Sequence, residues 1–212
     1  GGADKLVGGL GNDTYILDNS TQTITDSGGV DTIFSNLNKV LQTGIENLTL
    51  TGAAVFATGN TVANTLVGND LNNTLDGKAG ADLMYGKAGD DTYLIDNVGD
   101  QAIEIVGGID DGGNDTIKTA LTSWTLGAGI EALVYTSTLS FTGTGNALDN
   151  YMSAGAAIDT LNGGAGADRI YANAGDDIIN GGIDSDQLSG GPGNDKSISP
   201  RGEAHAATTT DF

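Results

Sequence analysis

A nine-residue period runs through much of this 212-residue chain and limits what it can fold into. In residues 8–16, 59–94 and 145–198, every unit carries Asn or Asp at its sixth place and, except at Ser197, an apolar residue at its eighth. A chain this rich in glycine and aspartate is otherwise typical of disorder, because it buries too little apolar surface to offset the entropy of ordering. Disorder has no reason to keep such a register, so we expect a folded repeat structure.

Nine residues suffice for one tight turn followed by one very short strand. Glycines at places one, two and four permit positive φ, so the first six places can form the turn. In the strand at places seven to nine, alternation points the apolar eighth residue inward. Two such nine-residue units make one coil, and stacked coils pair their strands in parallel sheets. The pattern predicts an all-β fold, a parallel β-solenoid.

The sixth-place side chains define candidate metal sites, since those of alternate units stack above one another in this solenoid. Stacked carboxylates repel unless a cation lies between them. Turn carbonyls with two carboxylates suit Ca²⁺ better than Mg²⁺, and zinc is a poor fit for a chain with one histidine and no cysteine. The predicted calcium ligands are Asp13, Asn64, Asn73, Asp82, Asp91, Asp100, Asn150, Asp159, Asp168, Asp177, Asp186 and Asp195, with the turn residues Gly77, Gly80, Gly86, Gly89, Gly163, Gly164, Gly166, Gly175, Gly181 and Gly182.

The number of carboxylates ranks these sites. In residues 145–198, three pairs from alternate units supply two carboxylates each, namely Asp159 with Asp177, Asp168 with Asp186, and Asp177 with Asp195. Pairs that contain Asn64, Asn73 or Asn150 supply one. Asp100 is placed to close a further site with Asp82. We therefore expect residues 154–195 to bind calcium most tightly.

Two units match a known repeat in full. Residues 8–16 read GGLGNDTYI and residues 163–171 read GGAGADRIY, which is the pattern Gly-Gly-x-Gly-x-Asp-x-apolar-x. The chain resembles the RTX family, the haemolysin-type calcium-binding repeat proteins. This resemblance covers nearly everything from residue 1 to about 195. It implies a right-handed parallel β-roll that binds several calcium ions, type I secretion from a Gram-negative bacterium, and folding outside the cell.

The stretches between the blocks resemble each other, which predicts tandem super-repeats. Asp31 and Asp115 each open an Asp-Thr-Ile segment at equivalent places of the two stretches. We expect super-repeats at about 8–85 and 86–162, a partial block at 163–195, and an irregular or disordered tail at 196–212. Apolar residues recur every eight to ten positions in the first stretch, from Tyr15 to Leu50, which favours a continuous solenoid over a small β-domain between two rolls.

Composition excludes several functions. A net charge of −20 with eight basic residues leaves no surface for neutralising nucleic-acid phosphates or for binding an anionic membrane, and no apolar run is long enough to span one. One histidine, His205, leaves no catalytic triad or zinc-protease motif. Adjacent acids such as Asp90 and Asp91 fit calcium binding better than acid–base catalysis, so we expect no enzymatic activity in this chain.

Two other classes of function stay open. The first is a carbohydrate-associated module of a secreted enzyme, similar to the repeat modules of alginate epimerases, with extracellular polysaccharide as partner. We expect Trp124, Tyr135 and Phe141 to be core or sheet-face residues rather than a sugar-stacking platform. The second is a structural repeat of a surface-layer protein or adhesin, which would self-assemble.

Overall fold

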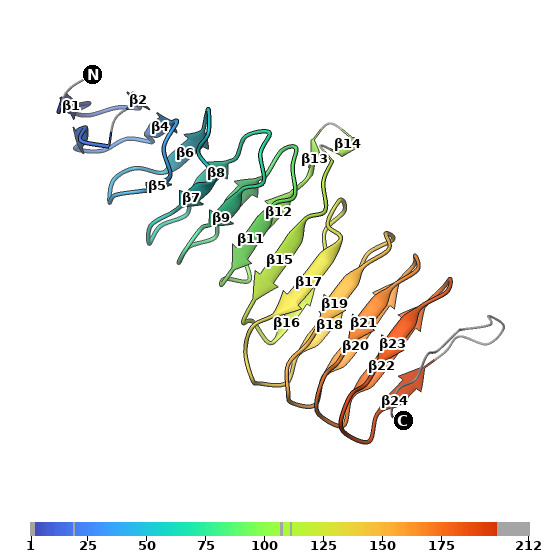
Figure 1. Ribbon diagram of the computed structural model, residues 1–212. Helices are drawn as coiled ribbons and strands as arrows, with labels where there is room; N and C mark the ends of the chain where they lie inside the picture. The colour runs from blue at the N-terminus through green and yellow to red at the C-terminus, as the bar shows by residue number, and fades with distance from the viewer. Residues whose placement is uncertain (1–2, 19, 107, 111, 199–212) are drawn as a thin grey trace. The chain divides into compact units, whose positions relative to one another are not determined.

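The computed structural model describes residues 3–18, 20–106, 108–110 and 112–198 (Figure 1). Within these ranges the regular elements are β-strands, with no helix and hence no helix long and apolar enough to cross a membrane. The chain forms two compact units, Gly1–Gly113 and Asn114–Phe212, called unit 1 and unit 2 below.

Unit 1 is a stack of short parallel strands. One parallel series contains β2 (Thr14–Leu17), β4 (Thr32–Ser35), β6 (Asn47–Leu50), β8 (Thr65–Val67), β10 (Leu83–Tyr85) and β12 (Gln101–Ile103), and a second contains β5 (Lys39–Val40), β7 (Phe56–Thr58), β9 (Thr74–Asp76) and β11 (Thr92–Ile95). In addition, β1 (Lys5–Val7) pairs in parallel with β3 (Thr23–Thr25), while β13 (Ile105–Val106) and β14 (Ile109–Asp110) form an antiparallel pair.

Unit 2 has the same architecture. Its first parallel series contains β15 (Thr116–Thr119), β17 (Ala132–Tyr135), β19 (Tyr151–Ser153), β21 (Arg169–Tyr171) and β23 (Gln187–Ser189), and its second contains β16 (Ser123–Thr125), β18 (Thr142–Thr144), β20 (Thr160–Gly164), β22 (Ile178–Gly182) and β24 (Lys196–Ile198). Successive strands in the chain alternate between the two series, so each pair of strands makes one coil of a parallel β-solenoid.

The strand register confirms the predicted coil of two repeat units. Leu66 pairs with Met84 in unit 1, and Met152 pairs with Ile170 in unit 2. The core of each unit contains its eighth-place residues, all of them buried: Leu66, Leu75, Met84 and Tyr93 in unit 1, and Met152, Leu161, Ile170, Ile179 and Leu188 in unit 2.

Spacer strands continue the solenoid within each unit, and several of their coils are shorter than two repeat units. Ile33 of β4 pairs with Leu48 of β6, and Ile117 of β15 pairs with Leu133 of β17, so each of these coils closes before two full repeat units have passed. Tyr135 and Phe141 are buried in the core, where their rings stack with centroids 4.4 Å apart. The spacer strands that pair in this way therefore add coils to the solenoid of each unit.

The last described strand lies beyond the predicted end of the repeats at residue 195. In β24, Ser197 occupies an eighth place and pairs with Ile179 of β22, while the three side chains of β24 are exposed. Backbone hydrogen bonds to the preceding coil extend the sheet here without a buried apolar side chain. For example, Lys196 N donates to the Asp177 carbonyl at 2.8 Å. Residues 199–212, the rest of the predicted tail, lie outside the described residues.

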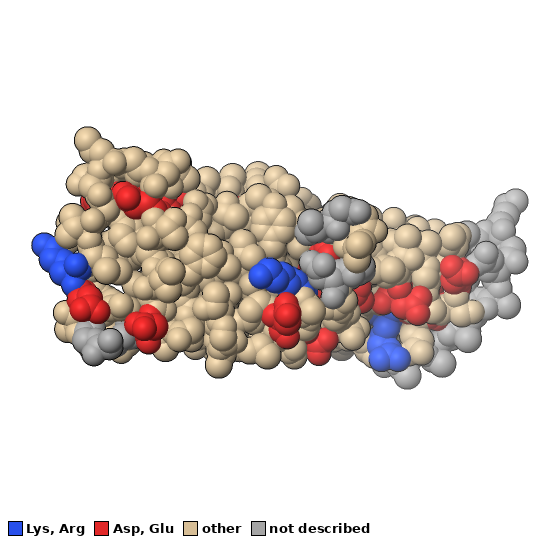
Figure 2. All heavy atoms as spheres, turned by 90° about the horizontal axis from the view of Figure 1, so that it is seen from above, with Lys and Arg blue, Asp and Glu red and all other residues tan. Residues whose placement is uncertain are grey.

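Acidic side chains outnumber basic ones in the chain by 28 to 8. On the face shown in Figure 2, basic side chains are few and lie apart, with acidic side chains beside them. An ion pair joins Lys78 to Asp76 at 2.8 Å. This face offers no continuous basic surface.

Candidate metal centre

The sixth-place side chains lie at the turns, one residue before each strand of the repeat blocks. In unit 2, Asn150, Asp168 and Asp186 precede β19, β21 and β23, while Asp159, Asp177 and Asp195 precede β20, β22 and β24. In unit 1, Asn64, Asp82 and Asp100 precede β8, β10 and β12, while Asn73 and Asp91 precede β9 and β11. All of these residues are buried except Asp195, which is half-buried.

Each of these aspartates binds the coil before it through one carboxylate oxygen. Asp168 Oδ1 accepts the Asn150 N–H at 2.8 Å, and Asp177 Oδ1 accepts the Asp159 N–H at 2.7 Å. The same bond to the preceding coil is made by Asp82, Asp91, Asp100, Asp159, Asp186 and Asp195. Acids of alternate units therefore lie in columns, as the period predicted.

The second carboxylate oxygen has no donor in several of these turns. The buried Oδ2 atoms without a hydrogen-bond partner include those of Asp13, Asp82, Asp168, Asp177 and Asp195. A buried acceptor left unpaired costs free energy, and a buried charge costs more. A ligand that supplies positive charge would remove this cost.

Turn carbonyls approach the same atoms. On the side of Gly163 where a side chain would project, Asp168 Oδ2 and the Gly181 carbonyl oxygen meet. The corresponding side of Gly77 faces Asp82 Oδ2. A carboxylate oxygen and a carbonyl oxygen around one small space are the donor types that Ca²⁺ prefers.

In two turns the second oxygen is satisfied by the protein itself. Asp100 Oδ2 accepts N–H groups of Asp96 and Asn97 at 3.1 and 3.0 Å, and Asp159 Oδ2 accepts the Gly155 N–H at 3.1 Å. These two carboxylates have less need of a cation than Asp168 or Asp177.

The three sixth-place asparagines close their turns with amide groups. Asn150 Oδ1 accepts the Asn146 N–H at 2.8 Å, and its Nδ2 donates to the Ile130 carbonyl at 3.2 Å. Asn64 and Asn73 accept from Asn60 and Asn69 in the same way, both at 2.7 Å. The amide groups of Asn64 and Asn150 each occupy a backbone carbonyl oxygen, so these turns are less suited to calcium than turns with a sixth-place aspartate.

The turn glycines serve two different purposes. Positive φ occurs at places two and four, as at Gly164 and Gly175 with φ of 107° and 146°. The first-place glycines, including Gly163 and Gly181, do not have it, contrary to the expectation for this place. At Gly163 and Gly181 glycine provides space, because a side chain would collide with the carboxylate of Asp168 or Asp186. Among the other glycines predicted as calcium ligands, Gly80, Gly89, Gly166 and Gly182 have positive φ. Gly77 and Gly86 stand at first places and do not have it.

Burial dominates the electrostatics of these acids. It raises the pKa of Asp168 and Asp91 to about 7 and the pKa of Asp82 and Asp177 to about 6, against the ordinary 3.8. A backbone N–H partly offsets this effect in each case, and the neighbouring Asp186 carboxylate raises the pKa of Asp168 further.

Acid is therefore expected to stabilise the metal-free protein. Because the pKa values of Asp168 and Asp177 are higher in the folded chain, protons bind that state more tightly, and this stabilisation is complete near pH 4 and lost as pH rises through about 6 to 7. Circular dichroism of metal-free protein between pH 4 and 8 measures it as the β-sheet signal. Metal-free protein that becomes more stable with rising pH would contradict the burial of these carboxylates.

Four acids in the spacers were not predicted as ligands, although they continue the columns. Asp31 Oδ1 accepts the Asp13 N–H at 2.7 Å, and Glu46 Oε2 accepts the Asp31 N–H at 2.9 Å. In unit 2, Glu131 Oε2 accepts the Asp115 N–H at 2.8 Å. The available signal is that each acid stands directly before a strand, as the sixth-place residues do.

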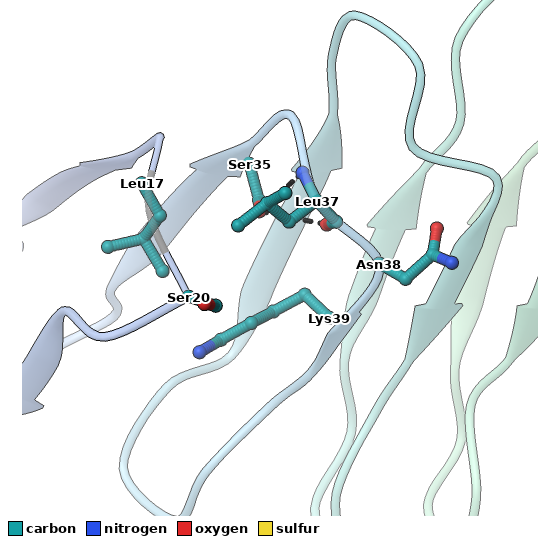
Figure 3. A pocket seen from close by; sticks show the side chains of 6 residues that line it. All are labelled: Leu17, Ser20, Ser35, Leu37, Asn38 and Lys39. Atoms are coloured by element: carbon teal, nitrogen blue, oxygen red, sulfur yellow. Dashed lines mark hydrogen bonds between the residues drawn. The ribbon is translucent and has the colours of Figure 1, made fainter.

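A groove in unit 1 contains none of the predicted ligands. Its volume is about 390 Å³, and Leu17, Ser20, Ser35, Leu37, Asn38 and Lys39 line it (Figure 3). Ser35 is in register with Leu17 and Leu50, and its hydroxyl donates to the Leu37 carbonyl at 2.9 Å. A small polar side chain in a leucine row leaves this space, so the groove reflects an irregular coil.

Fold and site together define a class of protein: a parallel β-roll whose glycine-rich turns carry columns of buried carboxylates. The model of the RTX calcium-binding nonapeptide repeat matches the chain at residues 1–15, 58–93, 144–179 and 165–196. The chain belongs to this repeat family. A comparison with curated proteins gives no significant match.

Proposed function

We propose that this chain is a calcium-binding module whose folding is completed by calcium. The observation that carries the proposal is the set of buried Oδ2 atoms, at Asp82, Asp168 and Asp177 among others, that have no hydrogen-bond donor. The buried carboxylates oppose folding without a counter-charge. Calcium held by the carboxylates and turn carbonyls supplies that charge.

The coupling between coils makes this folding cooperative. Asp177 accepts a backbone N–H from Asp159 in the coil before and donates its own N–H to Asp195 in the coil after. Ordering one turn therefore places the ligands of the next. Since no such site exists in the extended chain, calcium binding free energy becomes folding free energy.

Far-ultraviolet circular dichroism during a calcium titration tests the proposal. From chelator to about 10 mM calcium, which covers the affinities of extracellular modules, we expect a cooperative change from coil to β structure. Magnesium at the same concentration is expected to leave the chain largely unfolded, because it demands a tighter octahedron and keeps its waters. A β spectrum that chelator does not change would overturn the proposal.

Calcium-completed folding also suits secretion through a type I channel. A chain that stays extended in low-calcium cytoplasm can be threaded through such a channel and fold outside. In support, the chain has no cysteine and a net charge of −20, which keeps the extended form soluble. Its role in this proposal is binding and folding rather than catalysis.

A carbohydrate-associated role is a second candidate, favoured by one surface of unit 2. Tyr151 and Tyr171 are partly exposed there with ring centroids 5.7 Å apart, and Arg169 Nε donates to Gln187 Oε1 at 3.2 Å. A shallow groove of about 260 Å³ is lined by Tyr151, Arg169 and Gln187, among other residues. Binding on a glycan array that Tyr151→Ala abolishes would support this role.

A further inference from the structure

A three-carboxylate cluster in unit 1 differs from the repeat sites. Carboxylate oxygens of Asp13, Asp26 and Asp31 lie within 4.8 Å of one another. Asp31 is fully buried, and its Oδ2 has no hydrogen-bond donor, nor has that of Asp13. Three negative charges this close, two of them with an unpaired oxygen, call for a positive ligand.

The third acid, Asp26, comes from a spacer turn. Residues 26–31 read DSGGVD and stack on the turn 8–13, where Gly11 N donates to the Gly28 carbonyl at 2.9 Å. Asp26 follows Gly8 by one full coil, so it stands at the first place of its turn, where the full repeat has glycine. A carboxylate is thereby added to the two supplied by the sixth places.

Neighbouring groups hold Asp26 in this position. Its Oδ1 accepts the Gly28 N–H at 2.8 Å, and its Oδ2 accepts the Tyr15 hydroxyl. The bare side of Gly8 faces the Tyr15 hydroxyl, Asp13 Oδ2 and Asp26 Oδ2. Any side chain at residue 8 would fill the space between these oxygens.

Part of the arrangement occurs again in unit 1. The Tyr93 hydroxyl donates to Glu104, and the Tyr15 hydroxyl donates to Asp26. In both pairs the acid follows the tyrosine by 11 residues. The bare side of Gly86 faces the Tyr93 hydroxyl and Asp91 Oδ2, as Gly8 faces Tyr15 and Asp13. The tyrosine–acid pair is therefore a repeated feature of the chain.

We propose that Asp13, Asp26 and Asp31 form a further cation site, specific for a hard di- or trivalent ion such as Ca²⁺ or a lanthanide. Tyr15 is a positioning residue that fixes the Asp26 carboxylate. Asp26 and Asp31 lie outside the four segments that match the repeat model. The site extends the proposed function by adding an ion to the spacer. It is tested independently of calcium-driven folding of the repeats.

Asp26→Asn in the full chain tests the site, with calcium counted by equilibrium dialysis. We expect one ion fewer per chain, or one site weakened by at least about tenfold, since even indirect partners of metal ligands have effects of this size. Asp18→Asn removes the same charge from an exposed side chain nearby and should change neither number. Unchanged stoichiometry and affinity in Asp26→Asn would overturn the site.

Terbium luminescence gives a readout that a purely structural role would not move. Tyr15 is expected to sensitise terbium bound beside it, so Tyr15→Phe and Asp26→Asn should each remove the same part of the tyrosine-excited emission. Emission that neither variant changes would contradict the site. The circular dichroism transition with calcium should survive in Asp26→Asn, and its loss from the parent protein would instead refute the proposed function.

Discussion

Replacing Asp177 with asparagine is expected to remove two calcium ions and to lower the free energy of unfolding, by about 2.7 kcal/mol per lost ion when calcium is a hundredfold above its dissociation constant. Asp177 lies between Asp159 and Asp195 in its column, so both sites that it borders lose a carboxylate. Asparagine keeps an oxygen that can accept the Asp159 N–H, and the turn is therefore preserved.

The sign of the effect should reverse in chelator. Asp177 is fully buried and its Oδ2 has no donor, so without calcium its charge opposes folding. Asp177→Asn is then expected to be at least as stable as the parent protein. Urea unfolding in saturating calcium measures the loss of stability. The residual β-sheet signal in circular dichroism measures the effect in chelator, where the parent protein is expected to be largely unfolded.

The adjacent residue supplies a matched control. Asp176 is exposed and accepts the Asn194 N–H at 2.9 Å, a bond that asparagine can also accept. Asp176→Asn removes the same charge one position away, and we expect little change in either condition. If both variants lost the same number of ions, or neither lost any, calcium would not be bound between stacked sixth-place acids.

The period of the sequence specified the coil because it is a property of every unit. An apolar residue every nine positions placed Leu66 beside Met84 and Ile170 beside Leu188 in neighbouring coils, and the register follows from those buried pairs. The columns of acids followed from the same spacing. These predictions required no knowledge of side-chain geometry.

The state of each carboxylate could not be predicted, since it depends on where the backbone N–H groups of its own turn point. Asp159 and Asp177 stand at the same place of alternate units, yet Gly155 donates to Asp159 Oδ2 while Asp177 Oδ2 has no donor. Asp26 was missed for another reason. It lies in a spacer without the period, and its partner Tyr15 is 11 residues away in the sequence.

The choice between aspartate and glutamate follows the length of the coil. Where two stacked acids are 18 residues apart, an aspartate reaches the backbone N–H of the earlier one, as Asp177 reaches Asp159. Glu46 and Glu131 make the equivalent bond across 15 and 16 residues. The extra methylene group of glutamate compensates for the shorter turn, so the acid column continues through the spacers.

Gly175→Ala is expected to destabilise unit 2 by about 3 kcal/mol in saturating calcium, through backbone strain and overpacking together. Gly175 has a φ of 146°, and an added Cβ would lie 2.7 Å from the Ala157 carbonyl carbon and 2.9 Å from Asp177 Oδ1. The Ala157 obstacle is backbone of the preceding coil, which cannot move without disturbing the stack. The change should also weaken calcium binding, because it displaces Asp177.

Gly44→Ala separates the two contributions. Gly44 also has positive φ, 85°, but an added Cβ would meet no atom within 4 Å, so only backbone strain of about 1 kcal/mol is expected. Urea unfolding of both variants in calcium, with calcium counted in parallel, compares them. Equal losses of stability and unchanged calcium binding in Gly175→Ala would mean that the turn needs glycine for its φ alone. A larger loss accompanied by weaker calcium binding would show that the close approach of successive coils positions the Asp177 carboxylate.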